Sequence, residues 1–214
     1  MNNNNTKGYY DFDVDFESIL VQNSSIDEVF YIRDLKQRKL YFNADVDQFT
    51  SADICRHILQ FNAEDKGIPV EERKPITLYV TSNGGSVVAG FEIIDIIKAS
   101  KTPVYTVNLA NEYSMGFLIG LAGHKRYAMN NATFLMHDGS NFVYDSGKKA
   151  QDTIEFNKRM DKRIKKYILE NSNLTEEEYD AKERVEWYMF ADEAKKEGFV
   201  DYIIGVDCEL DEVI

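Results

Sequence analysis

Apolar and polar residues follow one another along the chain in blocks that switch between the period of a strand and the period of a helix. Short apolar runs predict strands over residues 39–43, 76–81, 104–108 and 133–137, and the run over 76–81 is rich in β-branched residues. Apolar positions at helical spacing lie between these runs. A last unit, residues 191–204, predicts a helix closed by Gly198 and then a strand over 200–204. This alternation is typical of an α/β layer structure.

Three helices are expected between the strands. The first has Thr50 or Ser51 as its N-cap, runs towards Phe61 and carries Ile54, Ile58 and Leu59 on one face. The charged stretch after it, residues 62–74, reads as a loop. The helices over 87–99 and 115–122 are apolar almost all round, so both are predicted to be buried.

Residues 147–170 form a different kind of segment. They contain eight basic and four acidic residues, with Ile154, Ile164, Tyr167 and Ile168 at helical spacing. The pattern predicts a long, mostly exposed amphipathic helix that projects from the core or lies over it.

Residues 1–36 also differ from the rest, because they combine seven acidic residues with closely spaced aromatic ones. The alternation over residues 12–16 is consistent with a strand that has one acidic face, and equally with an acidic arm that docks on a neighbouring subunit. We therefore expect an N-terminal arm or extension, residues 1–36, followed by one domain, residues 37–214.

Composition narrows the class of protein. The 214 residues include 37 acidic and 25 basic ones, a formal charge of −12, which argues against nucleic acid as a partner. No apolar run is long enough to span a membrane and no signal peptide opens the chain. Cys55 and Cys208 have no metal-binding spacing and read as free thiols. We expect a cytoplasmic protein without a metal or cofactor.

Three candidate catalytic groups stand at the ends of three predicted strands. Gly84-Gly85 follows the strand over 76–81, Ser114 follows the strand over 104–108, and His137 ends the strand over 133–137. Open α/β folds place reactive groups beyond the carboxyl ends of their strands. Acyl transfer needs a nucleophile, a base and backbone N–H donors for the oxyanion. The helix start at Met115 and the unobstructed backbone of Gly85 are suited to supply such donors.

Four ordered blocks, spanning about residues 38–205, resemble the Clp protease proteolytic subunit family. They are Ser82 to Gly90, Tyr113-Ser114-Met115-Gly116, Phe134 to His137, and Ala191 to Asp201. The resemblance implies an α/β fold of the Clp protease and crotonase type, a spiral of repeated β-β-α units, with residues 147–170 as a protruding handle helix. It also implies a serine endopeptidase that hydrolyses unfolded polypeptides by Ser-His-acid acyl transfer.

The resemblance assigns roles residue by residue. Ser114 becomes the nucleophile, His137 the general base, and the N–H groups of Gly85 and Met115 the oxyanion hole. Glu186 stands where the family has an Asp, and would orient the imidazole. Asp138 and Asp180 remain rival orienters, although Asp138 is adjacent to His137 on a strand and should point to the opposite face.

The resemblance also implies partners. Heptameric rings would assemble, singly or stacked in a double ring, through the helix over 147–170 and a strand segment at residues 140–146. Since the chain has no phosphate-binding loop, ATP would be handled by a hexameric AAA+ unfoldase that delivers the polypeptide. An acidic arm and a basic helix on one subunit would contribute to contacts between subunits.

Two other functions stay open. The first is a catalytically inactive structural subunit of a mixed ring. Two departures from the family pattern allow it, Glu186 in place of Asp and Asn83 in place of the usual Pro in the glycine turn. The second is a crotonase-like acyl-CoA enzyme, which would use backbone donors but would have no need of Ser114 and His137.

Overall fold

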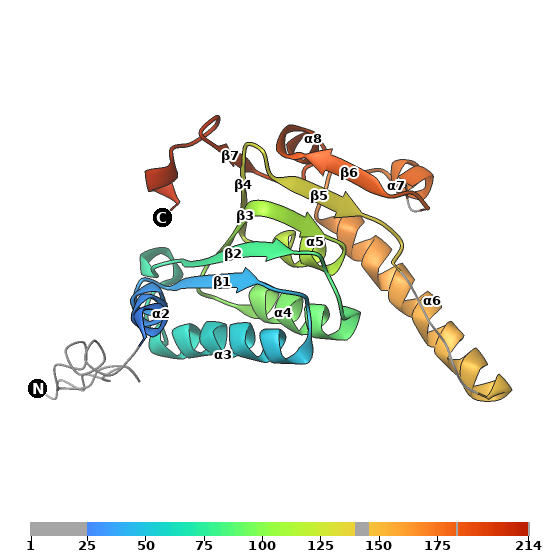
Figure 1. Cartoon of the computed structure of the whole chain (residues 1–214), viewed down its shortest axis with the longest axis horizontal. Coiled ribbons are helices and arrows are strands. Elements are labelled where there is room, and N and C mark those ends of the chain that lie inside the picture. The colour runs from blue at the N-terminus through green and yellow to red at the C-terminus, as the bar shows by residue number, and fades with distance from the viewer. Residues whose placement is uncertain (1–24, 140–145, 183, 214) are drawn as a thin grey trace, which may run out of the picture.

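The computed structural model describes residues 25–139, 146–182 and 184–213. This part of the chain is an α/β structure built on a mostly parallel sheet (Figure 1). The strand or arm expected over residues 12–16 lies outside the described residues, as do residues 140–145 of the segment expected to pair across rings. No helix in the described ranges is both long enough and apolar enough to cross a bilayer.

The elements follow in chain order as α2 (Ile26–Lys36), β1 (Lys39–Asn43), α3 (Gln48–Glu64), η1 (Val70–Glu72), β2 (Ile76–Ser82), α4 (Val87–Ala99), β3 (Val104–Tyr113), α5 (Met115–Gly120), β4 (Lys125–Met129), β5 (Thr133–Met136), α6 (Gly147–Glu170), α7 (Glu176–Lys182), β6 (Trp187–Phe190), α8 (Ala191–Lys196), β7 (Tyr202–Ile204) and η2 (Leu210–Glu212).

The sheet divides at β3. Its main path runs β1-β2-β3-β4-β7, with every neighbouring pair parallel. The first half of β3 pairs with β4, and its last three residues, 111–113, pair in parallel with β5 instead. β5 then pairs antiparallel with β6. Because β2, β3 and β5 are parallel, their carboxyl ends meet at one edge of the sheet.

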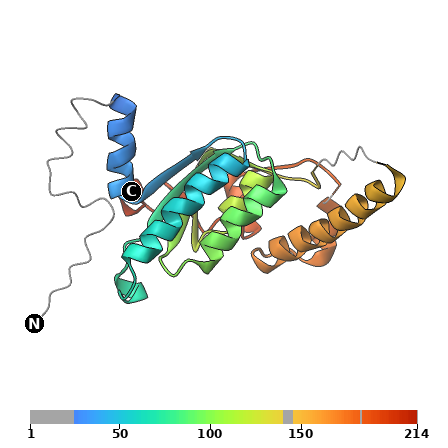
Figure 2. The same cartoon turned by 90° about the horizontal axis from the view of Figure 1, so that it is seen from below.

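Helices α3, α4 and α5 pack on the same face of the sheet, as Figure 2 shows from below. Their inward residues, among them Ile58, Ile93 and Ile97, are fully buried against the strands. All six residues of α5 are buried, as its apolar sequence predicted. A smaller apolar cluster on the opposite face joins Tyr79, Val107, Tyr127, Ile204 and Val213.

The helix α6 has the bounds predicted from the sequence and is mostly exposed. It stands away from the rest of the molecule over much of its length (Figures 1 and 2). Ile168, near its end, is its one described residue with a fully buried side chain. A hydrogen bond from the Tyr167 hydroxyl to the Leu118 carbonyl, 3.0 Å long, fastens the same end to the body.

The start of α3 was predicted three or four residues too late. Asp47, not Thr50 or Ser51, is the N-cap, and its carboxylate accepts hydrogen bonds of 2.8 Å from the Phe49 and Thr50 amides. The helix also continues to Glu64, into the stretch expected to be a loop. Ile54 and Ile58 are buried as expected, whereas Leu59 is 56% exposed and lies off the buried face.

Other differences come from tertiary pairing. β3 continues five residues past the predicted end because its last residues find a second partner in β5. The final strand begins at Tyr202, two residues later than expected. The strands β4 and β6 and the helices α2 and α7 were not predicted. β4 opens on Lys125 and Arg126 and β6 is only four residues long, so neither carries a clear apolar period.

Candidate active site

Ser114 occupies a strained turn between β3 and α5. Its backbone has φ 53° and ψ −119°, a region that non-glycine residues rarely adopt and that costs about 1–3 kcal/mol. The surrounding structure fixes this turn, since the Ser114 N–H donates to the Leu135 carbonyl at 2.9 Å. The buried α5 follows immediately. Strain of this kind, held by neighbours, is typical of residues with a functional position.

The turn after β2 packs closely against Ser114. A Cβ on Gly84 would lie 2.7 Å from the Ser114 Cβ, and a Cβ on Gly85 would lie 2.4 Å from the Val46 carbonyl oxygen. Only glycine therefore fits at either position. The Asn111 side chain donates to the Ser82 carbonyl at 3.1 Å and ties the end of β2 to β3.

Two backbone donors adjoin the serine. Met115 is the first residue of α5, so its N–H lacks an acceptor within the helix. The Gly85 N–H is part of the close-packed turn and is not used in the bridge between Val46 and Gly85, which is made by the Val46 and Ser86 amides. Neither N–H group donates a backbone hydrogen bond among the described residues.

His137 and Glu186 are brought together by the antiparallel pairing of β5 with β6. The last pair of that ladder is Met136 with Trp187, so the next residues outward face each other. The His137 Nδ1 lies 2.9 Å from the Glu186 Oε1. The Glu186 side chain is 58% exposed, whereas that of His137 is 20% exposed. Glu186 was selected from motif spacing, and β6 is the element that positions it.

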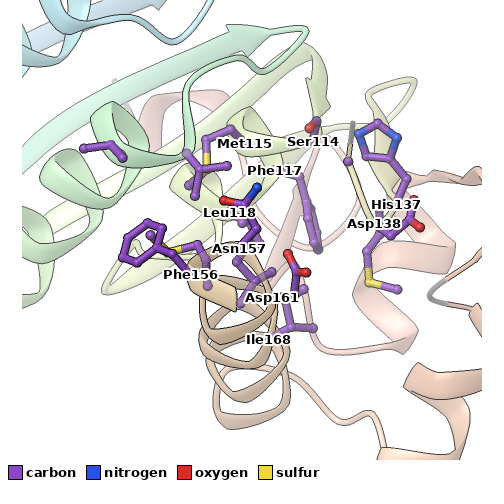
Figure 3. Close-up of a pocket in the computed structure, with 16 residues that line it drawn as sticks. Ser114, Met115, Phe117, Leu118, His137, Asp138, Phe156, Asn157, Asp161 and Ile168 are labelled. Atoms are coloured by element: carbon purple, nitrogen blue, oxygen red, sulfur yellow. The ribbon is translucent and has the colours of Figure 1, made fainter. Parts of the chain in front are cut away.

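The other ring nitrogen of His137 points inward. Its Nε2 is buried and has no hydrogen-bond partner among the described residues, so it is not bonded to Ser114 Oγ in this structure. Ser114 and His137 nevertheless line the same pocket (Figure 3). A nucleophile and base that are close but unbonded are common in ligand-free sites, where catalytic contacts tighten on binding.

Neither of the rival orienters forms a hydrogen bond with His137 among the described residues. Asp180 forms an ion pair with Lys165, with 2.5 Å between Oδ1 and Nζ. Asp138 lines the pocket and makes no hydrogen bond to His137 within the described ranges.

The pocket beside Ser114 has a volume of about 150 Å³ and is formed by the sheet edge, α5 and α6. Figure 3 shows Asp161 on α6, with its carboxyl group towards the space below Ser114 and His137. Burial, together with the charge of Asp138, raises the pKa of Asp161. Sequence reasoning did not select Asp161, because nothing along the chain places α6 against the strand ends.

Glu112, near the end of β3 and two residues before Ser114, is a buried carboxylate. It is 4% exposed, and a Cβ on Gly120 would lie 2.0 Å from its Oε2. Burial raises its pKa well above the ordinary value for a carboxyl group. Its side chain packs against α5 and does not line the pocket.

A second hollow, of about 850 Å³, runs between α4 and α6. It is lined by apolar residues, by the basic side chains Lys98, Arg159, Arg163 and Lys166, and by the acidic side chains Asp95 and Glu170.

A comparison with models of protein families matches residues 23–207 to the family described as Clp protease. The matched stretch contains Ser114, His137, Glu186 and both backbone donors. It also includes α2, which the four motif blocks had left outside the resemblance.

Proposed function

The chain belongs to the Clp protease family, and on that premise we propose that it is a serine endopeptidase with Ser114 as nucleophile, His137 as general base and Glu186 as orienting carboxylate. Membership of this family implies peptidase activity. The assignment rests on the surroundings of the two ring nitrogens of His137. One ring nitrogen is held by Glu186 at 2.9 Å, and the other is buried without a partner in the pocket that Ser114 lines.

In the proposed mechanism, Nε2 of His137 takes the proton of the Ser114 hydroxyl as Oγ attacks the carbonyl carbon of the scissile peptide. The N–H groups of Gly85 and Met115 donate hydrogen bonds to the resulting oxyanion. Glu186 accepts the Nδ1–H of His137, which keeps Nε2 free to act as the base and stabilises the imidazolium.

The imidazolium then gives its proton to the leaving amine, and the peptide C–N bond breaks to leave an acyl-enzyme on Ser114. A water molecule, deprotonated by the same Nε2, attacks the ester, and its proton returns to Ser114 as the carboxylic acid product leaves. The residues required lie just after β2, β3 and β5, at the start of α5 and just before β6.

Proteins of this family typically form oligomeric rings, and we extend the proposal to this chain. The projecting α6 supports it, because a long helix with one anchored end offers a surface for a second copy. The basic side chains of the hollow between α4 and α6 are suited to receive an acidic arm, residues 1–36, from a neighbour. We further propose a heptameric ring, a crotonase-type spiral fold and an AAA+ unfoldase as the source of unfolded polypeptide.

The alternative is an inactive structural subunit. Two features favour it: Glu186 is largely exposed, and the hydrogen bond between Ser114 and His137 is not formed in the described structure.

Labelling with a fluorophosphonate probe separates these functions. We expect the full-length protein to be labelled on Ser114 and the Ser114→Ala variant to remain unlabelled. Ser172→Ala is the matched control, because Ser172 does not line the pocket and its hydroxyl donates to the backbone carbonyl of Ile168. No labelling of the assembled parent protein would favour the inactive subunit. Undiminished labelling of Ser114→Ala would mean that another residue is the nucleophile.

A further inference from the structure

The pocket beside Ser114 is placed to receive a side chain of the substrate. A peptide carbonyl positioned for attack by Ser114 would bring the side chain of its own residue, the P1 residue, to the pocket mouth. The volume of about 150 Å³ accommodates about five non-hydrogen groups, taking about 30 Å³ for each. The walls are mainly apolar and come from both the body and α6; they include Met115, Phe117, Leu118, Phe156, Met160 and Ile164.

Two carboxylates interrupt this apolar lining. Asp161 comes from α6 and Asp138 follows His137, and neither a lysine nor an arginine lines the pocket within the described ranges. The charge of Asp138 contributes, after burial, to the raised pKa of Asp161, so the two carboxyl groups act on each other across the pocket. No hydrogen bond or ion pair of Asp161 is found among the described residues, so its charge is not satisfied locally.

The two lysines that lie about one helical turn from Asp161 on α6 pair with other groups. Lys165, one turn later, binds Asp180 and Glu176, and Lys158, one turn earlier, lies 3.8 Å from Glu155. The pocket therefore combines apolar walls with a local excess of negative charge next to the nucleophile. That combination matches a long aliphatic side chain that ends in a cation.

We propose that Asp161, assisted by Asp138, makes this pocket select a basic P1 residue, lysine above all. The four methylenes of lysine lie along the apolar walls from α5 and α6, and the ammonium group donates hydrogen bonds to the Asp161 carboxylate. The proposal rests on the peptidase function proposed for Ser114 and adds the class of peptide that it cleaves.

The test compares peptide substrates, and matching phosphonate probes that label serine, which differ only in carrying lysine or norleucine at P1. Norleucine has the same four-carbon chain as lysine and lacks the ammonium group. We expect the full-length protein to favour lysine by tenfold or more in kcat/KM and in labelling rate. In Asp161→Asn, which keeps the shape and removes the charge, the ratio of lysine to norleucine should fall towards one, and further in the double variant with Asp138→Asn.

Asp152→Asn is the matched control, since Asp152 is an exposed residue of α6 that does not line the pocket. It should keep the preference of the parent protein. A parent protein that favours norleucine, or an Asp161→Asn variant with an unchanged ratio, would overturn the proposal while leaving Ser114 as nucleophile. Failure of both probes to label the parent protein would instead overturn the peptidase function itself.

Discussion

Replacing Glu186 by alanine tests the most unusual part of the candidate site, a proposed orienting carboxylate that solvent can reach. The hydrogen bond that it accepts from His137 is charge-assisted, and such bonds contribute about 1.5–3 kcal/mol. With about 1.36 kcal/mol for each factor of ten, its loss corresponds to a reduction in kcat of about 10- to 150-fold. Because the Glu186 side chain is 58% exposed, water can take its place, and the lower half of that range is expected. A triad with a buried acid loses about 10⁴-fold when the acid is changed.

The assay is the hydrolysis of a fluorogenic peptide at saturating and limiting concentrations. Glu186 does not line the pocket, so KM should change by less than about threefold while kcat falls. Asp180→Ala is the control, because Asp180 binds Lys165 and should leave kcat unchanged. A kcat of Glu186→Ala within twofold of the parent value would refute the role of Glu186. A loss of 10⁴ would refute the reasoning from exposure, since it requires a carboxylate shielded from water in the working enzyme.

Three further changes test the structure around the site. Asp65→Ala should lower the free energy of unfolding by about 3–5 kcal/mol in urea titrations, because it removes the bidentate partner of the Arg38 guanidinium. The Arg38 side chain is only 14% exposed. A loss below about 1 kcal/mol would contradict this reasoning. Glu112→Gln should raise the melting temperature relative to the parent protein more at pH 8 than at pH 5. The raised pKa keeps Glu112 protonated in the folded state. The parent protein therefore loses stability as the pH rises above the ordinary carboxyl pKa, by about 1.36 kcal/mol per pH unit until the folded-state pKa is reached. An equal gain at both pH values would show that ionisation of Glu112 is not the cause. Gly84→Ala should abolish probe labelling of Ser114 and lower the melting temperature, since the new Cβ meets the Ser114 Cβ at 2.7 Å; a fully labelled variant would contradict the close packing.

Much of the site could be predicted because its residues stand at the ends of strands with clear apolar patterns. Parallel strands bring their carboxyl ends to one edge, so the order of strands and motifs along the chain is enough to predict that Gly85, Ser114 and His137 lie together. The long α6 was also predictable, since its polar and apolar positions keep helical spacing over 24 residues. In these segments the spacing of apolar residues along the chain matches their placement in the folded structure.

The features of the site that could not be predicted depend on contacts between segments that are distant in sequence. Nothing within residues 184–190 shows that β6 pairs with β5, and that pairing alone places Glu186 opposite His137. Asp161 reads as one more solvated charge on an exposed helix until α6 is placed beside the strand ends. The N-cap of α3 was missed for a local reason, because Asp47 and Thr50 form a reciprocal capping pair and the cap was sought at Thr50 or Ser51 instead of Asp47.

Because α6 is anchored at one end, a tilt of this helix would change the shape of the pocket that it helps to enclose. Its fixed point is near Ile168, which is buried, whereas Phe156 lies twelve residues away, about 18 Å along the axis at 1.5 Å per residue. A tilt of about 5° around that point would displace Phe156 by about 1.5 Å and Ile164 by about a third as much, since it lies only four residues from it. Displacements near 1 Å at a reacting centre change rates by factors of about 100. A force applied to the projecting part of this helix, far from Ser114, would therefore reshape the mouth of the pocket before it disturbed the serine, the histidine or the sheet that holds them.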